Sequence, residues 1–92
     1  MRIMKVFVLT YAHFKGEGEL ESDVIGVYST KTRAKEEMNE RKAYCLEQLR
    51  EEDENVSVST YQDSPSFWGV NVNEECEWIE MSITEHVVDK ED

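Results

Sequence analysis

The densest group of side chains that could do chemistry is the run NEECEWIE, which holds Glu74, Glu75, Glu77 and Glu80. Carboxylates at this density could bind a divalent cation. A calcium-binding loop, however, needs an Asp-rich pattern with a central glycine, and this run has neither. A two-metal hydrolase needs acids that converge at strand ends beside a lysine, and Lys90 is the only lysine in residues 47–92. We therefore predict a solvated acidic surface without a metal, and keep a hydrolase as an alternative.

The histidines and cysteines do not have catalytic spacing. His13 and His86 form no H-x-x-H pattern, and Cys45 and Cys76 form no C-x-x-C pair. Cys45 falls on the apolar stripe of a predicted helix. The glutamates beside Cys76 would raise the pKa of its thiol, which disfavours a nucleophile. The run GEGE at 16–19 lacks the spacing of a phosphate-binding loop. The sequence thus predicts no enzyme activity and no cofactor.

The formal net charge is −11, and it is unevenly distributed along the 92 residues. Residues 1–46 hold eight Lys or Arg and seven Asp or Glu, whereas residues 47–92 hold two and fourteen. An acidic half of this kind repels nucleic acid and anionic membranes and attracts basic protein surfaces. We therefore expect no direct contact with nucleic acid or membrane. The apolar part of IMKVFVLTYA near the start is too short for a signal peptide, which predicts a cytoplasmic protein.

The chain length predicts a single domain, 1–92, and the patterning predicts an α+β class. Thr30 suits the N-cap of a helix that places Ala34, Met38, Cys45 and Leu49 on one stripe. The order is β-β-α-β-β-β, which favours two layers with one helix on an antiparallel sheet. The expected strands span residues 3–12, 23–29, 56–61, 67–73 and 76–88, the helix 30–52, a mobile loop 13–22, a turn 63–66 and a polar tail 89–92.

One helix can cover only one face of this sheet. Trp68, Val70, Val72 and Trp78 cannot all pack beneath the same helix as the Ile79, Met81 and Ile83 set. Apolar surface left on the other face usually marks an interface. The sequence therefore predicts a homodimer packed sheet to sheet.

The predicted helix ends in REEDE, which places Glu51, Glu52, Asp53 and Glu54 at the negative end of the helix dipole. Each exposed acid there is unfavourable by roughly 0.3–1 kcal/mol at low salt. Residues that violate local physics in this way are typical of functional sites. The alternative is that the helix frays near Arg50 and the acids lie in a hydrated loop.

The segments MKVFVLTYAH and DVIGVYSTKTRAKEEM carry a resemblance. Residues 4–38 resemble short, uncharacterised bacterial and phage proteins that have a KVYVL-like strand and a GVYSS-x-x-KA joint between strand and helix. Residues 26–30 match the joint, Ala34 takes the alanine position, and Arg33 replaces the usual lysine. No activity is attached to the pattern, so the resemblance implies a scaffold and a bacterial or phage origin.

Two hypotheses follow for function. In the first, a non-enzymatic protein binds a basic, nucleic-acid-handling protein surface, as a phage-type inhibitor would, with its carboxylates standing in for phosphates. Trp68 and Trp78 would supply contact energy, and the acids would speed association. In the second, the chain is a self-associating structural or accessory domain whose charge maintains solubility. The predicted binding residues are Trp68, Trp78, Glu74, Glu75, Glu77, Glu80, Glu51, Glu52, Asp53 and Glu54.

Overall fold

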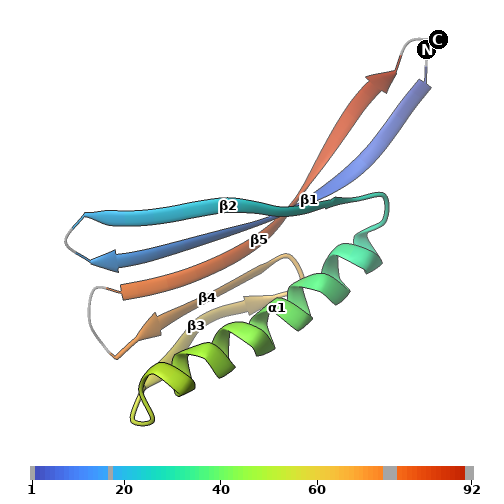
Figure 1. Ribbon diagram of the computed structural model, residues 1–92. Coiled ribbons are helices and arrows are strands. Elements are labelled where there is room, and N and C mark those ends of the chain that lie inside the picture. The colour runs from blue at the N-terminus through green and yellow to red at the C-terminus, as the bar shows by residue number, and fades with distance from the viewer. Residues whose placement is uncertain (1, 17, 74–76, 91–92) are drawn as a thin grey trace.

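One helix lies on one face of a five-stranded antiparallel sheet (Figure 1) in the computed structural model, which describes residues 2–16, 18–73 and 77–90. The predicted α+β class is confirmed. Within the sheet the strands lie in the order β2-β1-β5-β4-β3, so β5 is central and the spatial order departs from the order along the chain. The elements are β1 (Arg2–Gly16), β2 (Glu19–Tyr28), α1 (Lys31–Glu52), β3 (Val58–Ser64), β4 (Phe67–Val72) and β5 (Glu77–Lys90).

The segment 13–22 is a hairpin, and the prediction of a mobile loop there is wrong. β1 and β2 pair from Phe7–Tyr28 to Gly16–Glu19, with register shifts between Leu9 and Thr10 and between Phe14 and Gly16. Gly16 and Gly18 have φ of 87° and 83°, values that glycine adopts without a steric penalty, and they allow the tight turn. The expected polar tail is also partly wrong, since β5 continues to Lys90.

The register between β4 and β5 determines which apolar side chains form the core. Trp68 lies opposite Met81 and Val70 lies opposite Ile79. The alternating apolar residues of β4 and those of β5 therefore lie on the same face of the sheet, which is the face towards α1. They pack with Leu9 of β1 and with the stripe of Ala34, Met38 and Leu49 on α1. We predicted that Trp68, Val70, Val72 and Trp78 would not all pack beneath α1. The first three do, at only 4%, 0% and 2% exposed, and Trp78 is the one that lies on the other face.

The face of the sheet opposite α1 has no covering element in the part of the chain that the structure describes (Figure 1). We call it the open face. Its centre is formed by the even-numbered residues of β1 from Met4 to Phe14 and of β5 from Trp78 to Val88, which pair in an unbroken register. Trp78 is on this face, as the sequence predicted.

β1 and β5 also extend beyond their neighbours as a two-stranded arm. β2 pairs with β1 only from Phe7 onwards, and β4 pairs with β5 only as far as Ser82. Residues 2–6 and 86–90, which we call the arm, therefore project past α1 (Figure 1). Met4 and Val88 on the arm are 43% and 45% exposed. The arm gives the molecule its length of 54 Å, against 26 and 20 Å in the other two directions.

Candidate interaction surfaces

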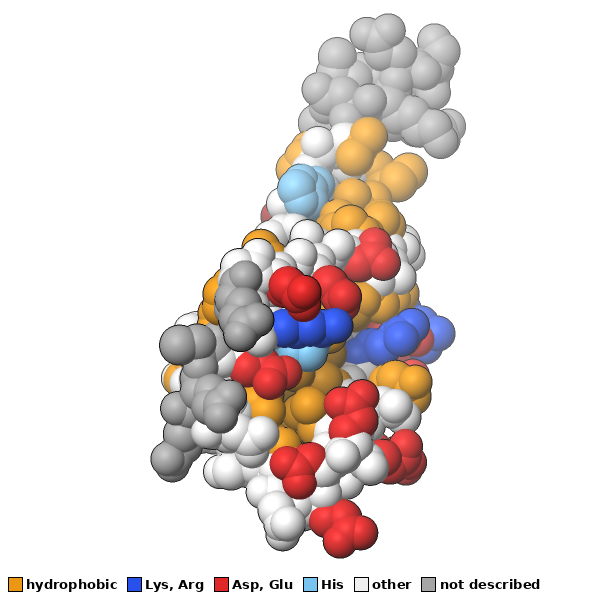
Figure 2. All heavy atoms as spheres, turned by 60° about the vertical axis from the view of Figure 1, so that its left-hand side comes forward, with side chains coloured by type: hydrophobic (Ala, Val, Ile, Leu, Met, Phe, Trp, Pro, Cys, Tyr) orange, Lys and Arg blue, Asp and Glu red, His pale blue; other side chains and the backbone are white. Residues whose placement is uncertain are grey.

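Carboxylates from three distant parts of the sequence gather at the end of the molecule opposite the arm. Two of these parts are the start of β2 and the end of α1, and the third is the start of β5 (Figure 1). Figure 2 brings this end forward and shows Asp and Glu side chains spread over it. We call this surface the acidic end, and it consists of Glu19, Glu21, Glu51, Glu52, Asp53, Glu54 and Glu77. Glu74 and Glu75, which were also predicted for the binding site, lie outside the described residues.

The end of α1 holds two of these acids in a formed helical turn. The helix continues through Glu52, and the backbone N–H of Asp53 donates to the carbonyl of Leu49 at 3.1 Å. The Asp53 carboxylate in turn accepts from the backbone N–H of Asn55 at 3.0 Å. Fraying near Arg50 is therefore not seen, and that alternative is wrong. Glu51 and Glu52 lie at the negative end of the helix dipole, where their charge is unfavourable.

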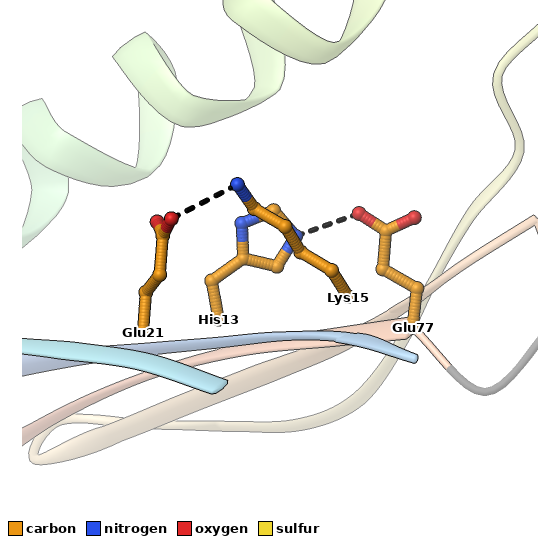
Figure 3. Close-up of polar contacts among 4 residues, drawn as sticks. All are labelled: His13, Lys15, Glu21 and Glu77. Carbon is orange, nitrogen blue, oxygen red and sulfur yellow. Dashed lines mark hydrogen bonds and ion pairs between the residues drawn. The ribbon is translucent and has the colours of Figure 1, made fainter. Parts of the chain in front are cut away.

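A groove with mixed polar and apolar lining lies between α1 and the β1–β2 hairpin and opens at the acidic end. Two adjoining hollows of about 360 and 420 Å³ share Tyr11, Cys45 and Gln48 as lining. Inside, His13 Nε2 lies 2.6 Å from the carboxylate of Glu77, with the two side chains only 13% and 27% exposed. Beside them Lys15 Nζ donates to Glu21 at 3.1 Å (Figure 3). We predicted no catalytic role for His13 and placed it in a mobile loop, whereas it lies in β1, half-buried and hydrogen bonded with Glu77.

The electrostatics of the groove disfavour ionisation of its phenol and its thiol. Burial raises the pKa of Tyr11 to about 12, with smaller contributions from negative charge at Cys45, Glu21 and Glu77. Burial also raises the pKa of the Cys45 thiol to about 11. At neutral pH the thiol is protonated, so Cys45 is a poor nucleophile. The pKa of Lys15 is raised as well, chiefly by its hydrogen bond with Glu21.

The open face carries aromatic side chains at the end nearest the acidic end. Phe14 and Trp78 are stacked, with ring centroids 5.5 Å apart and planes 14° from parallel. The Tyr61 hydroxyl donates to Glu80, the one acid of this face among the described side chains. At its middle, Thr10 and Ser82 are joined by a hydroxyl–hydroxyl hydrogen bond of 2.8 Å. The open face thus combines apolar, aromatic and uncharged polar groups.

The residues predicted for one binding site are divided between these two surfaces. Trp78 and Glu80 lie on the open face, whereas Glu77 points to the α1 side, because successive residues of a strand alternate. Glu51, Glu52, Asp53 and Glu54 belong to the acidic end. Trp68 belongs to neither surface, since it is 4% exposed beneath α1. It therefore cannot be a contact residue in this conformation.

Sequence reasoning missed Phe14 and Tyr61 on the open face and Tyr11 and His13 in the groove. The signal for Phe14 was its even spacing from Thr10 and Ala12, which would have continued the first strand. Two consecutive glycine–glutamate pairs at 16–19 obscured it, since they are typical of loops. No local signal identifies Tyr61, because a β-bulge between Thr60 and Gln62 alters the alternation of β3.

Comparison of the chain with protein-family models, with curated proteins and with solved structures finds no match. Within residues 2–16, 18–73 and 77–90, no three or more His, Cys, Asp or Glu side chains are arranged to hold a metal ion. The same residues contain no helix that is long and apolar enough to cross a membrane.

Proposed function

We propose that the protein is a non-enzymatic interaction protein whose acidic end binds a basic protein surface. The observation that carries the proposal is the convergence of carboxylates from β2, α1 and β5 on one end of the molecule. A partner that normally holds nucleic acid would present the complementary basic surface, as a phage-type inhibitor of such a protein requires. Like charges gathered in one place raise the rate of encounter with an opposite charge.

The local charge around Lys15 supports an attraction for cations. Lys15 on β1 is surrounded by Glu19, Glu21 and Glu52, all of which raise the pKa of its ammonium group. Glu77 lies in the same hollow but is hydrogen bonded to His13. One ammonium group therefore faces more carboxylates than it can neutralise. A lysine or arginine from a partner would meet a favourable field here.

Capture from bacterial lysate on the immobilised 92-residue chain tests the proposal. Washing in salt steps, with mass spectrometry of each fraction, should release a basic protein at moderate salt. The double variant Glu51→Gln/Glu52→Gln should bind that protein about tenfold more weakly at low salt. Its matched control is Glu36→Gln/Glu40→Gln, which removes the same charge from exposed sites earlier in α1. Equal loss in both variants, or an affinity that does not change with salt, would contradict a role for the acidic end.

The second candidate is self-association through the open face. The stacked Phe14–Trp78 pair on an uncovered sheet face favours it, since exposed apolar patches of this kind are typical of interfaces. Trp78→Ala should then lower the solution mass from dimer to monomer in sedimentation equilibrium. Binding of a basic partner at the acidic end should be unaffected per chain, which separates the two candidates. A wild-type chain that stays monomeric would exclude the second candidate.

A further inference from the structure

The open face is large enough and sufficiently free of charge for a second copy of the chain to cover it. The described side chains of the face include no Lys or Arg and, as acid, only Glu80, although the net charge is −11. Two copies can therefore meet on this face without bringing many like charges together. From the spacing of strands and residues, the five-stranded part of the open face measures about 24 by 24 Å and the arm about 14 by 10 Å. The area of the face is therefore roughly 700 Å². A standard interface buries about 800 Å² per partner.

The centre of the open face is formed by the small residues Thr10 and Ser82, which are hydrogen bonded to each other. Along the strands, a different apolar residue lies on each side of this centre. Phe14 lies four residues from Thr10 towards the acidic end, and Val6 lies four residues from it towards the arm. Each is about 14 Å from the centre. A two-fold axis through the centre and perpendicular to the strands would place Phe14 of one copy over Val6 of the other.

The positions of the charges favour this antiparallel arrangement over the parallel one. With the axis perpendicular to the strands, the acidic ends lie at opposite ends of the dimer. With the axis along the strands, the two acidic ends would lie side by side, where like charges repel. The antiparallel axis also brings Glu80 towards the uncharged Thr84 of the second copy, whose hydroxyl lies 3.0 Å from His86 Nε2 of its own chain, so the one acid of the face meets no second carboxylate.

The arm supplies an independent argument. It is a two-stranded ribbon with exposed Met4 and Val88, and an isolated hairpin of this kind is at best marginally stable in water. In the antiparallel arrangement Val6 and His86, at the base of each arm, lie over Phe14 and Trp78 of the other copy, and Met4 and Val88 lie two residues further along. Burial of the arm would then stabilise its pairing.

We propose that the open face joins two copies of this chain about a two-fold axis near Thr10 and Ser82, with each arm packed on the Phe14–Trp78 pair of the other copy. The inference rests on the self-association candidate above and adds the arrangement to it. An isologous interface of this type closes after two subunits.

Sedimentation equilibrium with two charge variants tests the interface. Thr84→Glu places a second carboxylate opposite Glu80 of the other copy and should weaken the dimer about tenfold. Thr84 is exposed, so the monomer fold should tolerate the change, which circular dichroism checks. Thr32→Glu on α1 is the matched control, since it adds the same charge at another exposed threonine and should leave the dimer unchanged. Equal weakening by both variants would overturn the interface.

Cross-linking with a bis-maleimide reagent that spans about 10 Å then tests the arrangement, in a background with Cys45→Ala and Cys76→Ser. Stacked sheets lie about 10 Å apart, too far for a direct disulfide, so the reagent should join the two copies through Thr10→Cys, which lies near the axis. Val88→Cys should not cross-link beyond the level of a Thr32→Cys control, because the two arms point in opposite directions. Efficient cross-linking through Val88→Cys, or none through Thr10→Cys in a chain of dimeric mass, would overturn the arrangement but leave self-association standing. A monomeric mass in the wild-type chain would overturn both.

Discussion

At the scale of single residues, the contact of Tyr61 with Gly69 and Glu80 explains why a glycine lies in the middle of β4. A Cβ at Gly69 would lie 2.5 Å from the Tyr61 ring, so the ring occupies the space that a side chain would need. The ring reaches across the bare backbone to donate its hydroxyl hydrogen to Glu80 on β5. The glycine thus allows an aromatic side chain from the edge strand to bridge to the central strand.

We predict that Gly69→Ala destabilises the protein by about 1 kcal/mol, because it displaces Tyr61 and breaks the hydrogen bond with Glu80. In a Tyr61→Ala background the same substitution should cost much less, since the space is then free and alanine is preferred to glycine in a strand. Urea unfolding of the four proteins in the double-mutant cycle measures the difference. An equal cost in both backgrounds would assign the role of the glycine to its backbone instead.

The half-buried phenol of Tyr11 should make stability depend on pH in the alkaline range. Its pKa is about 12 in the folded chain, against about 10 when unfolded. Between these values the unfolded state releases a proton that the folded state retains, so stability falls as pH rises from 10 to 12. Tyr11→Phe should lose less stability across this window, by on the order of 1 kcal/mol after solvent screening. Urea unfolding at pH 9 and 11 tests this, and identical losses in the two proteins would contradict it.

The sequence predicted the face on which Trp78 lies but not the burial of Trp68, because both depend on how the neighbouring strands pair. Alternation along 67–73 and 76–88 identified two apolar sets correctly. Which sets share a face depends on the register between the strands, which is determined by the geometry of the connection between them. The register that pairs Trp68 with Met81 sends Trp68 into the core and leaves Trp78 outside. No pattern within one strand contains that information.

At the scale of elements, the joint between β2 and α1 is the part that local chemistry specifies best. Thr30 adopts an extended backbone conformation, and its hydroxyl oxygen accepts from the backbone N–H of Arg33 at 3.2 Å. The observed helix, Lys31–Glu52, agrees with the predicted range of 30–52. Its boundaries were predictable because a cap and an apolar stripe act through neighbours in sequence.

We predict that Thr30→Ala lowers the free energy of unfolding by about 1 kcal/mol through loss of this cap. The control is Thr32→Ala, which makes the same change inside the first turn. There alanine is the better helix former, so stability should stay the same or rise slightly. Thermal unfolding followed by circular dichroism compares the two. Equal effects of both substitutions would show that the cap contributes nothing measurable.

The hairpin and the arm could not be predicted in the same way, because their strands depend on pairing with other segments and their own composition does not indicate a strand. His13 to Ser22 is polar and rich in glycine and glutamate, which is typical of a loop. His13, Phe14 and Gly16 belong to a strand because they pair with Glu21, Leu20 and Glu19 across the hairpin, and β1 pairs in addition with β5. Asp89 and Lys90 likewise join β5 through pairing with Ile3 and Arg2.

At the scale of the whole molecule, charge and apolar surface are separated. The acidic end carries carboxylates from β2, α1 and β5, whereas the open face has Glu80 as its one acid among the described side chains. A protein with both surfaces can respond to salt in two opposite ways. Added salt weakens attraction between opposite charges on two molecules, and it also weakens repulsion between two molecules of like net charge.

Salt should therefore move the two proposed interactions in opposite directions. Between about 50 and 500 mM NaCl, affinity of the acidic end for an arginine-rich peptide should fall at least about tenfold, because that contact is electrostatic. Over the same range the dimer should hold or tighten, because its interface is apolar and the net charge of −11 on each copy is screened. Fluorescence titration with the peptide and sedimentation equilibrium of the free chain measure the two quantities on one preparation. A dimer that weakens in parallel with peptide binding would mean that opposite charges hold the copies together, and would contradict a self-interface on the open face.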